Sequence, residues 1–304
     1  METTLISPSR LLKSAFELYR KHLKLIVALM AAPTLFIVGG LLVAGYGNMW
    51  GHLLVAVGRI AAYAFGIGLV ALYAGQITSR DEVVSRGMKL FFPAIWVSIL
   101  AGLATMGGFF LFIIPGIVLT ILLSIVQPIL VVEDKRGFAA LIASWNYTKE
   151  YKGKILWRML VIGVCFLLTV IVIGILGGMV TGESIKVSVG EAGNAEGNLV
   201  TNILLDVVSS LFLTPVIIAF MYLLYRNLKD VRGAASELGV EETSRIKKKL
   251  IALIVVAIVG MIIFIAIMGW LIFAYMSVLG EPGSPFQMQN SLVPAAQVFS
   301  VFQK

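Results

Sequence analysis

Long uninterrupted apolar runs are the feature that most constrains how this chain can fold. A helix needs about 20 apolar residues to cross the hydrocarbon core of a bilayer. Runs of about that length or longer cover residues 25–45, 53–75, 91–132, 155–180, 203–225 and 250–275. They occupy over half of the 304 residues, and only 13% of the chain is charged. A soluble α/β enzyme, a disordered chain and a disulfide scaffold are therefore excluded.

The run over residues 91–132 is too long for one crossing. As a single helix it would extend about 63 Å, roughly twice the thickness of the hydrocarbon core. Gly107-Gly108 and Pro115-Gly116 are its strong helix breakers, so we expect a tight apolar turn between them. The chain is therefore predicted to be an all-α, polytopic transmembrane helix bundle of seven spans. Six of them form a core of three hairpins, and the seventh is an extra C-terminal span.

The distribution of Lys and Arg predicts how the chain is oriented, because positively charged flanks are retained on the cytoplasmic side. With the N-terminus in the cytoplasm, all but three of the 24 Lys and Arg residues lie in inner segments; the exceptions are Arg59, Lys186 and Lys304. The C-terminus is then outside. The formal net charge of +8 belongs to the inner face of a membrane in this topology, so nucleic acid is not an expected partner.

Two segments are predicted to be amphipathic helices on the inner surface. Residues 7–22 begin with Ser7 as the N-cap and Pro8 at the first helical position, followed by apolar residues at helical spacing among Lys and Arg. Residues 137–149 repeat this plan after the fourth span. Duplication and the general basic, amphipathic character of inner loops explain the similarity equally well.

Basic and aromatic residues in and after these two helices are the candidate lipid contacts. Each Lys or Arg near an anionic membrane surface contributes about 1 kcal/mol of attraction. The expected contacts are Arg10, Lys13, Arg20, Lys21, Lys24, Trp145, Lys149, Lys152 and Lys154. The predicted partners are therefore anionic lipids of the inner leaflet, together with another membrane protein or a second copy of the chain.

Two ionisable residues fall inside spans, where a charge is costly enough to suggest a function. Arg59 lies in the second span and Asp206 in the sixth, both within about 10 Å of the outer boundary in this topology. Three interpretations are open. The two side chains form a charge pair, Arg59 extends outward alone while Asp206 occupies a first helical turn, or both line a solute site.

Glu133, Asp134, Lys135 and Arg136 follow one another at the end of the fourth span. We expect them to form a charge-network joint between this span and the next surface helix, because no His or metal-ligand spacing accompanies the two carboxylates. The sequence contains no recognisable catalytic motif and no metal-binding motif. Enzyme activity, a metal and a cofactor are therefore not expected.

Three stretches resemble a bacterial multispan membrane family that includes the membrane domain of some glycerophosphodiester phosphodiesterases. They are SPSRLLKSAFELYRKHLKLI, the block from IIPGIVLTILL to NYTKEYKGK, and TPVIIAFMYLLYRNLKD, within residues 5–232. The resemblance implies a six-helix core in the bacterial cytoplasmic (inner) membrane. It does not extend to the phosphodiesterase activity, because this chain carries no separate catalytic barrel.

The expected organisation follows from these assignments. Residues 1–232 form the six-span core with its surface helices, and residues 233–304 add a cytoplasmic basic segment, the span over 250–275 and an outer tail. The function that fits best is non-catalytic: a lipid-interacting protein, or an organising or accessory subunit of a membrane assembly. The alternative is a transporter or flippase for a lipid-like or small amphipathic solute that enters past Arg59 and Asp206.

Overall fold

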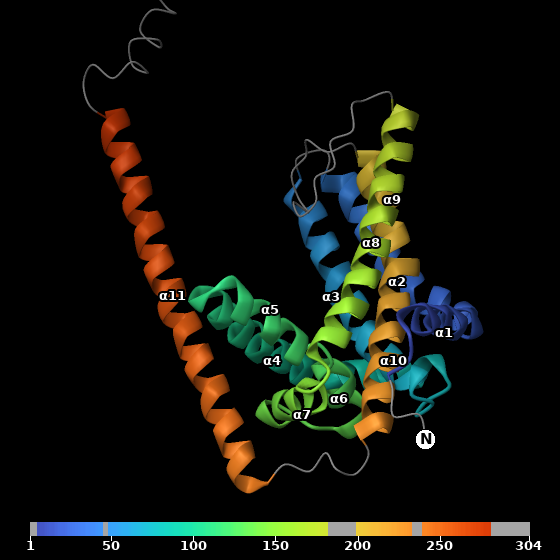
Figure 1. The fold of residues 1–304 in the computed structure, drawn as a ribbon. Coiled ribbons are helices and arrows are strands. Elements are labelled where there is room, and N and C mark those ends of the chain that lie inside the picture. Colours follow the sequence, from blue (N-terminus) through green and yellow to red (C-terminus); the bar gives the residue numbers. More distant parts are fainter. Residues whose placement is uncertain (1–4, 45–47, 182–198, 233–238, 281–304) are drawn as a thin grey trace, which may run out of the picture.

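A bundle of long apolar helices makes up the protein (Figure 1). The computed structural model describes residues 5–44, 48–181, 199–232 and 239–280, and these residues contain no strand. Seven helical segments in this part are long and apolar enough to cross a membrane: Leu23–Ala44, Met49–Tyr73, Arg80–Leu111, Ile113–Glu133, Lys152–Met179, Leu199–Arg232 and Val240–Tyr275. The predicted all-α, multi-pass bundle is confirmed. The outer tail and Lys186 lie outside the described residues.

Helix α1 (Pro8–Lys21) lies across the end of the bundle at which α2 (Leu23–Ala44) begins, and the chain bends between them at His22 (Figure 1). Pro8 occupies the first helical turn as predicted, although the Ser7 side chain makes no capping hydrogen bond. Leu11, Ala15 and Tyr19 are buried along one side of α1. We call the end of the bundle that carries α1 and its Lys and Arg residues the basic end.

Helix α3 (Met49–Tyr73) runs back beside α2, and small residues bring the two backbones together. A Cβ atom on Gly58 would lie 2.9 Å from the Pro33 carbonyl oxygen of α2. A Cβ atom on Gly68 would overlap the Val83 carbonyl oxygen of α4 (Arg80–Leu111). Close backbone approach through small residues is how apolar helices gain van der Waals contact in lipid.

The run over residues 91–132 turns back at Phe112, between the two predicted breakers. Phe112 is extended, with φ −168° and ψ 161°, and separates α4 from α5 (Ile113–Leu122). Phe112, Ile113 and Ile114 at the tip of this hairpin are 70–75% exposed. In Figure 1, α4 and α5 are inclined to α3, and the tip lies near the level of α1 instead of the far ends of the long helices. The tip is therefore apolar surface close to the basic end.

A hairpin that enters and leaves the bilayer from one side has a simple consequence for the topology. It contributes two helices and returns the chain to the side from which it came. The helices that follow it are therefore oriented as they would be after two full crossings, and the sorting of Lys and Arg to one side does not depend on how deep the hairpin reaches.

Two short helices follow the hairpin at the basic end. Helix α6 (Val126–Glu133) leads through Asp134, which has a left-handed backbone with φ 51°, to α7 (Phe138–Thr148). The chain then runs through α8 (Lys152–Thr181) away from the basic end and returns through α9 (Leu199–Val208) and α10 (Thr214–Arg232) (Figure 1).

Helix α11 (Val240–Gly280) packs mainly against α4 of the hairpin (Figure 1). A Cβ atom on Gly107 of α4 would overlap the Leu253 carbonyl oxygen, and the Phe110 ring lies against Gly260. Side chains from Met261 to Phe273 are exposed. The hairpin therefore supports the half of α11 nearer the basic end, and the other half presents apolar side chains to its surroundings.

The position of the hairpin tip predicts the labelling of an introduced cysteine. The experiment uses a Cys165→Ser background and a membrane-impermeant maleimide, added on the side of the membrane at which Met49→Cys reacts. Ile113→Cys should not react with the maleimide from that side. The reason is that the tip between α4 and α5, where residue 113 begins α5, lies near the level of α1 (Figure 1), whereas Met49 begins α3 at its other end and is 68% exposed. Equal labelling of the two cysteines from that side would show that the hairpin crosses the membrane completely.

Candidate functional site

The two ionisable residues expected within spans lie together in the structure. Arg59 of α3 and Asp206 of α9 approach to 3.8 Å between Nη2 and Oδ1. Their side chains are 45% and 27% exposed to the surroundings of the bundle. Because an isolated charge in hydrocarbon is costly, each side chain reduces the cost of placing the other there. Of the three interpretations of the sequence, the geometry corresponds to the charge pair.

A π-helix, Ser209–Leu213, begins three residues after Asp206 and joins α9 to α10. The Thr214 N–H donates to the Ser209 carbonyl, five residues back. The Ser210 hydroxyl donates to the Asp206 carbonyl at 2.7 Å and lies 2.8 Å from the Thr34 hydroxyl of α2. Such single turns often mark functional positions, and here neighbouring hydroxyl groups hydrogen-bond to the irregular segment within an apolar bundle.

The π-helix also forms part of the seat of α1. The Tyr19 hydroxyl of α1 donates to the Leu211 carbonyl at 3.2 Å. Burial raises the pKa of Tyr19, so this hydroxyl stays protonated and remains a donor. The Phe212 ring meets the Tyr19 ring edge to face at 5.5 Å and the Phe16 ring at 6.1 Å. One end of α1 is thereby fixed to the sixth span.

The other end of α1 is fixed by the residue that precedes it. The Ile6 N–H donates to the Asn227 side chain of α10 at 3.1 Å. The Ile6 carbonyl accepts from the Arg158 guanidinium of α8, with 3.1 Å to Nε. Arg158 is only 5% exposed, so this carbonyl and that of Lys154 are important for solvating its charge. Helix α1 is thus held at both ends by polar contacts.

Glu133 is the centre of the predicted charge-network joint at the end of α6. Its Oε1 atom accepts from the Tyr225 hydroxyl at 2.7 Å and the Tyr147 hydroxyl at 3.0 Å, and lies 3.1 Å from Lys229 Nζ. Its Oε2 atom lies 2.8 Å from Lys135 Nζ. Only 10% of the Glu133 side chain is exposed. This single carboxylate therefore joins α6, α7 and α10.

Asp134 and Arg136 occupy the periphery of this joint. They pair with each other at 3.3 Å, and more than half of each side chain is exposed. Ion pairs with that exposure contribute little to stability, about 0–1 kcal/mol. The four consecutive charged residues thus differ in role, and Glu133 makes the contacts that connect the helices.

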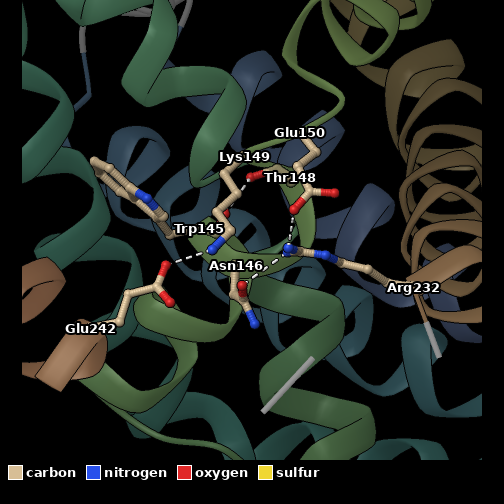
Figure 2. Close-up of polar contacts among 7 residues, drawn as sticks. All are labelled: Trp145, Asn146, Thr148, Lys149, Glu150, Arg232 and Glu242. Carbon is tan, nitrogen blue, oxygen red and sulfur yellow. Dashed lines mark hydrogen bonds and ion pairs between the residues drawn. The ribbon is translucent and has the colours of Figure 1, made fainter. Parts of the chain in front are cut away.

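A second polar cluster connects α7 with α10 and α11 (Figure 2). Lys149, at the end of α7, pairs with Glu242 of α11 at 2.6 Å. Arg232 of α10 donates to the Asn146 side chain at 2.9 Å and pairs with Glu150 at 2.5 Å. These contacts attach α11 and the end of α10 to the segment that follows α7.

The residues expected to contact lipid are divided by the structure into two groups. Lys149 is engaged by Glu242, and Trp145 packs against the core of the bundle. The remaining basic residues are exposed: Arg10, Lys13, Arg20, Lys21, Lys24, Lys152 and Lys154. Of the expected lipid contacts, the exposed cations therefore lie on α1, at the start of α2 and at the start of α8.

Helix α7 differs from the surface helix predicted over residues 137–149. It lies among α4, α5, α6, α10 and α11. Ala140 and Ser144 are fully buried, and the Ser144 and Thr148 hydroxyls donate to the Leu122 carbonyl of α5 at 2.7 and 3.1 Å. Small and hydroxyl-bearing residues permit this close packing. The prediction of a surface helix here is wrong, because other helices of the protein cover much of α7.

Sequence reasoning missed the polar partners of the π-helix. Thr34 and Ser210 were not singled out, although Ser209-Ser210 interrupts the apolar run just after Asp206, and Tyr19 was expected only on the apolar face of the first surface helix. Hydroxyl residues in apolar helices commonly bond to carbonyls of the preceding turn, and both Thr34 and Ser210 do so. The hydroxyl residues within apolar segments were visible in the sequence. Their pairing was not, because the partners come from three segments that lie far apart in the chain.

Comparison with family models, curated proteins and solved structures finds no match for this chain. Among the described residues, no group of three or more His, Cys, Asp or Glu side chains could hold a metal ion.

The intramembrane pair predicts energetic coupling. Arg59→Leu and Asp206→Leu should each lower the free energy of unfolding in detergent by about 2–3 kcal/mol, because each leaves one charge uncompensated. The double variant should lose less than the sum, with a coupling energy of about 0.5–3 kcal/mol. The exchange Arg59→Asp with Asp206→Arg should recover part of the loss. Additive effects in this cycle would exclude an energetically significant pair.

The two carboxylates of the joint predict a contrast between matched amide substitutions. Glu133→Gln should destabilise the protein by about 2–4 kcal/mol, because two lysines and two tyrosine hydroxyls lose a charged acceptor with little exposure. Asp134→Asn, one residue further along, should cost less than about 1 kcal/mol. Unfolding midpoints of both variants in the same detergent measure the difference. Equal losses would contradict the assignment of Glu133 as the centre.

Proposed function

We propose that this protein is a non-catalytic integral membrane protein that binds anionic lipids of the inner leaflet and organises lipid or a membrane assembly there. The observation that carries the proposal is the arrangement of α1. Its apolar side is buried against the bundle, and Arg10, Lys13, Arg20 and Lys21 are exposed on the rest of it. A docked amphipathic helix with its cations left accessible is typical of binding to an anionic membrane surface.

The positive charge on α1 is only partly offset by the part of the chain that the structure describes, since Glu17 is the one acidic residue of this helix. None of its Lys and Arg residues, nor Lys24, forms an ion pair with a described carboxylate. This contrasts with Lys149 and Lys229, which both have acidic partners. Burial and the neighbouring Lys21 lower the pKa of His22, so its imidazole is neutral at pH 7. The positive potential therefore comes from Lys and Arg and does not depend on pH near neutrality.

The proposed location is the bacterial cytoplasmic membrane, with the basic end in the cytoplasm, the N-terminus inside and the C-terminus outside. The sorting of Lys and Arg supports this orientation. The resemblance of residues 5–232 to the multispan family supports the bacterial membrane and stays a prediction. Anionic phospholipids are the ligands that a cationic surface at this level would meet first.

Charge removal at matched positions tests lipid binding. The variant in which Lys13, Lys21 and Lys24 become Gln should retain fewer anionic lipids when purified from equal parts phosphatidylglycerol and phosphatidylcholine. We expect the ratio of the two bound lipids to fall at least fivefold, since about 1 kcal/mol is lost per residue. Mass spectrometry of the copurified lipids gives the ratio.

Two controls separate a lipid-binding surface from net charge alone. Converting Lys247, Lys248 and Lys249 of α11 to Gln changes the charge equally but leaves α1 intact, and Lys149→Gln removes a lysine already paired with Glu242. Both should retain more phosphatidylglycerol than the α1 variant. If the two triple variants lose phosphatidylglycerol equally, overall charge and not the α1 surface determines its retention. If the α1 variant loses none, the proposal is overturned.

Transport of a lipid-like or small amphipathic solute is the second candidate function. The observation that favours it is the polar cluster of Arg59, Asp206, Thr34 and Ser210 around a π-helix, since such irregular turns accompany solute pathways in membrane proteins. Uptake and lipid-flip assays in reconstituted vesicles distinguish the two functions. Flux that is lost in Asp206→Leu while the protein stays folded would favour the transporter.

A further inference from the structure

An apolar groove of about 440 Å³ lies between α1, α8 and the sixth span. Its walls include Leu12 and Phe16 of α1, Ile162 and Phe166 of α8, and Phe212 and Val216 of the sixth span. The volume falls within the range of about 300–1,000 Å³ that is usual for small-molecule sites. A groove of this composition excludes a polar solute and accommodates a hydrocarbon chain.

The level of the groove follows from α1. This helix bends at His22 into α2, and the His22 ring lies 6.2 Å from the ring of Tyr73 at the end of α3. The basic ends of two spans therefore meet beside the end of α1. A groove whose wall is α1 lies at the boundary between headgroups and acyl chains, so lipid is the ligand with direct access to it.

The charged groups at the groove lie on the α1 wall. Ser9 and Lys13 belong to its lining, and the Arg20 guanidinium lies 6.0 Å from the centre of the Phe16 ring that also lines it. Lys13, Phe16 and Arg20 follow one another at helical spacing, so they share one side of α1. Two cations thus flank the apolar wall. Glu17 lies at helical spacing from both, but neither cation is within ion-pair distance of a described carboxylate.

The π-helix gives the groove its aromatic wall. One additional residue in the turn rotates the side chains that follow by about 100° relative to an uninterrupted α-helix. In the observed register Phe212 meets both Phe16 and Tyr19 and closes the groove against α1. The irregular turn therefore has a structural consequence at the groove as well as at the polar cluster around Ser210.

We propose that the groove is a site for one anionic phospholipid of the inner leaflet. An acyl chain lies between Phe16, Phe166 and Val216, and the phosphate lies at Lys13 with Arg20 adding to the positive potential. The proposal rests on the proposed lipid-binding function and adds a defined position, a stoichiometry of one and a preference for a negatively charged headgroup. It predicts a lipid that exchanges more slowly than the lipids surrounding the rest of the bundle.

Photo-crosslinking of the full chain in nanodiscs tests the site. The probe is phosphatidylglycerol with a diazirine in one acyl chain, present at low abundance in phosphatidylcholine, and mass spectrometry identifies the labelled peptides. We expect labelling concentrated on residues 162–169 and 212–217. Unlabelled phosphatidylglycerol should compete at least fivefold better than phosphatidylcholine or a free fatty acid.

Cys165 offers a variant that fills the groove with little risk to folding, because it lines the groove and is exposed. Cys165→Trp should reduce the labelling at least fivefold, whereas Cys165→Ser and Leu167→Trp should not. Leu167 is the matched control, since it is 48% exposed on α8 and does not line the groove. Lys13→Gln should remove the preference for phosphatidylglycerol and leave labelling of the groove by a phosphatidylcholine probe.

The outcomes separate this site from the general function. Two results would show that the probe labels ordinary surrounding lipid and would overturn the site. One is that phosphatidylcholine competes as well as phosphatidylglycerol, and the other is that Cys165→Trp leaves the labelling unchanged. Equal competition by the fatty acid would show a site for a single chain with a carboxylate and overturn the phospholipid. In either case the proposed function would stand if the α1 triple variant still lost phosphatidylglycerol, and would fail if it did not.

Discussion

The cost of placing charge in hydrocarbon is the constraint on which the rest of the structure depends. It explains why the cations gather at one end of the bundle and why charged side chains within or beside the spans have partners. Arg59 lies beside Asp206, Arg158 is hydrogen-bonded to backbone carbonyls, and Glu133 is surrounded by two lysines and two hydroxyl groups. The exposed cations of α1 form no ion pair with a described carboxylate, and they outnumber Glu17, the one acidic residue of this helix, so α1 keeps a net positive charge for a ligand.

Local patterns in the sequence were sufficient for the helices and for the turn at Phe112. Span length, helix breakers and the sorting of Lys and Arg act through neighbouring residues and the bilayer, and all are readable without knowing the fold. The same holds for the start of α1 at Pro8. The approach of Arg59 to Asp206 was one of several alternatives, and their similar depth was the signal that made the pair conceivable.

Contacts between distant segments could not be read in this way. The seat of α1 needs Tyr19, Leu211 and Asn227, which come from opposite ends of the core. Lys149 has the same local surroundings as a lipid-facing lysine, and only the position of α11 brings Glu242 to it. Helix α7 was predicted to be a surface helix like α1, yet its small residues allow other helices to cover it. Periodicity identifies an apolar face without identifying what buries it.

The proposed function joins these observations at α1, which is anchored at both ends, cationic on its free side and bordered by an apolar groove. The most direct measurement is a density map of the protein purified with native membrane lipids. The account predicts phospholipid density along α1, with a headgroup near Lys13 and Arg20 and a chain beside Phe166. A map in which another protein chain covers the cations of α1, or in which α1 is well ordered and no lipid lies beside it, would contradict it.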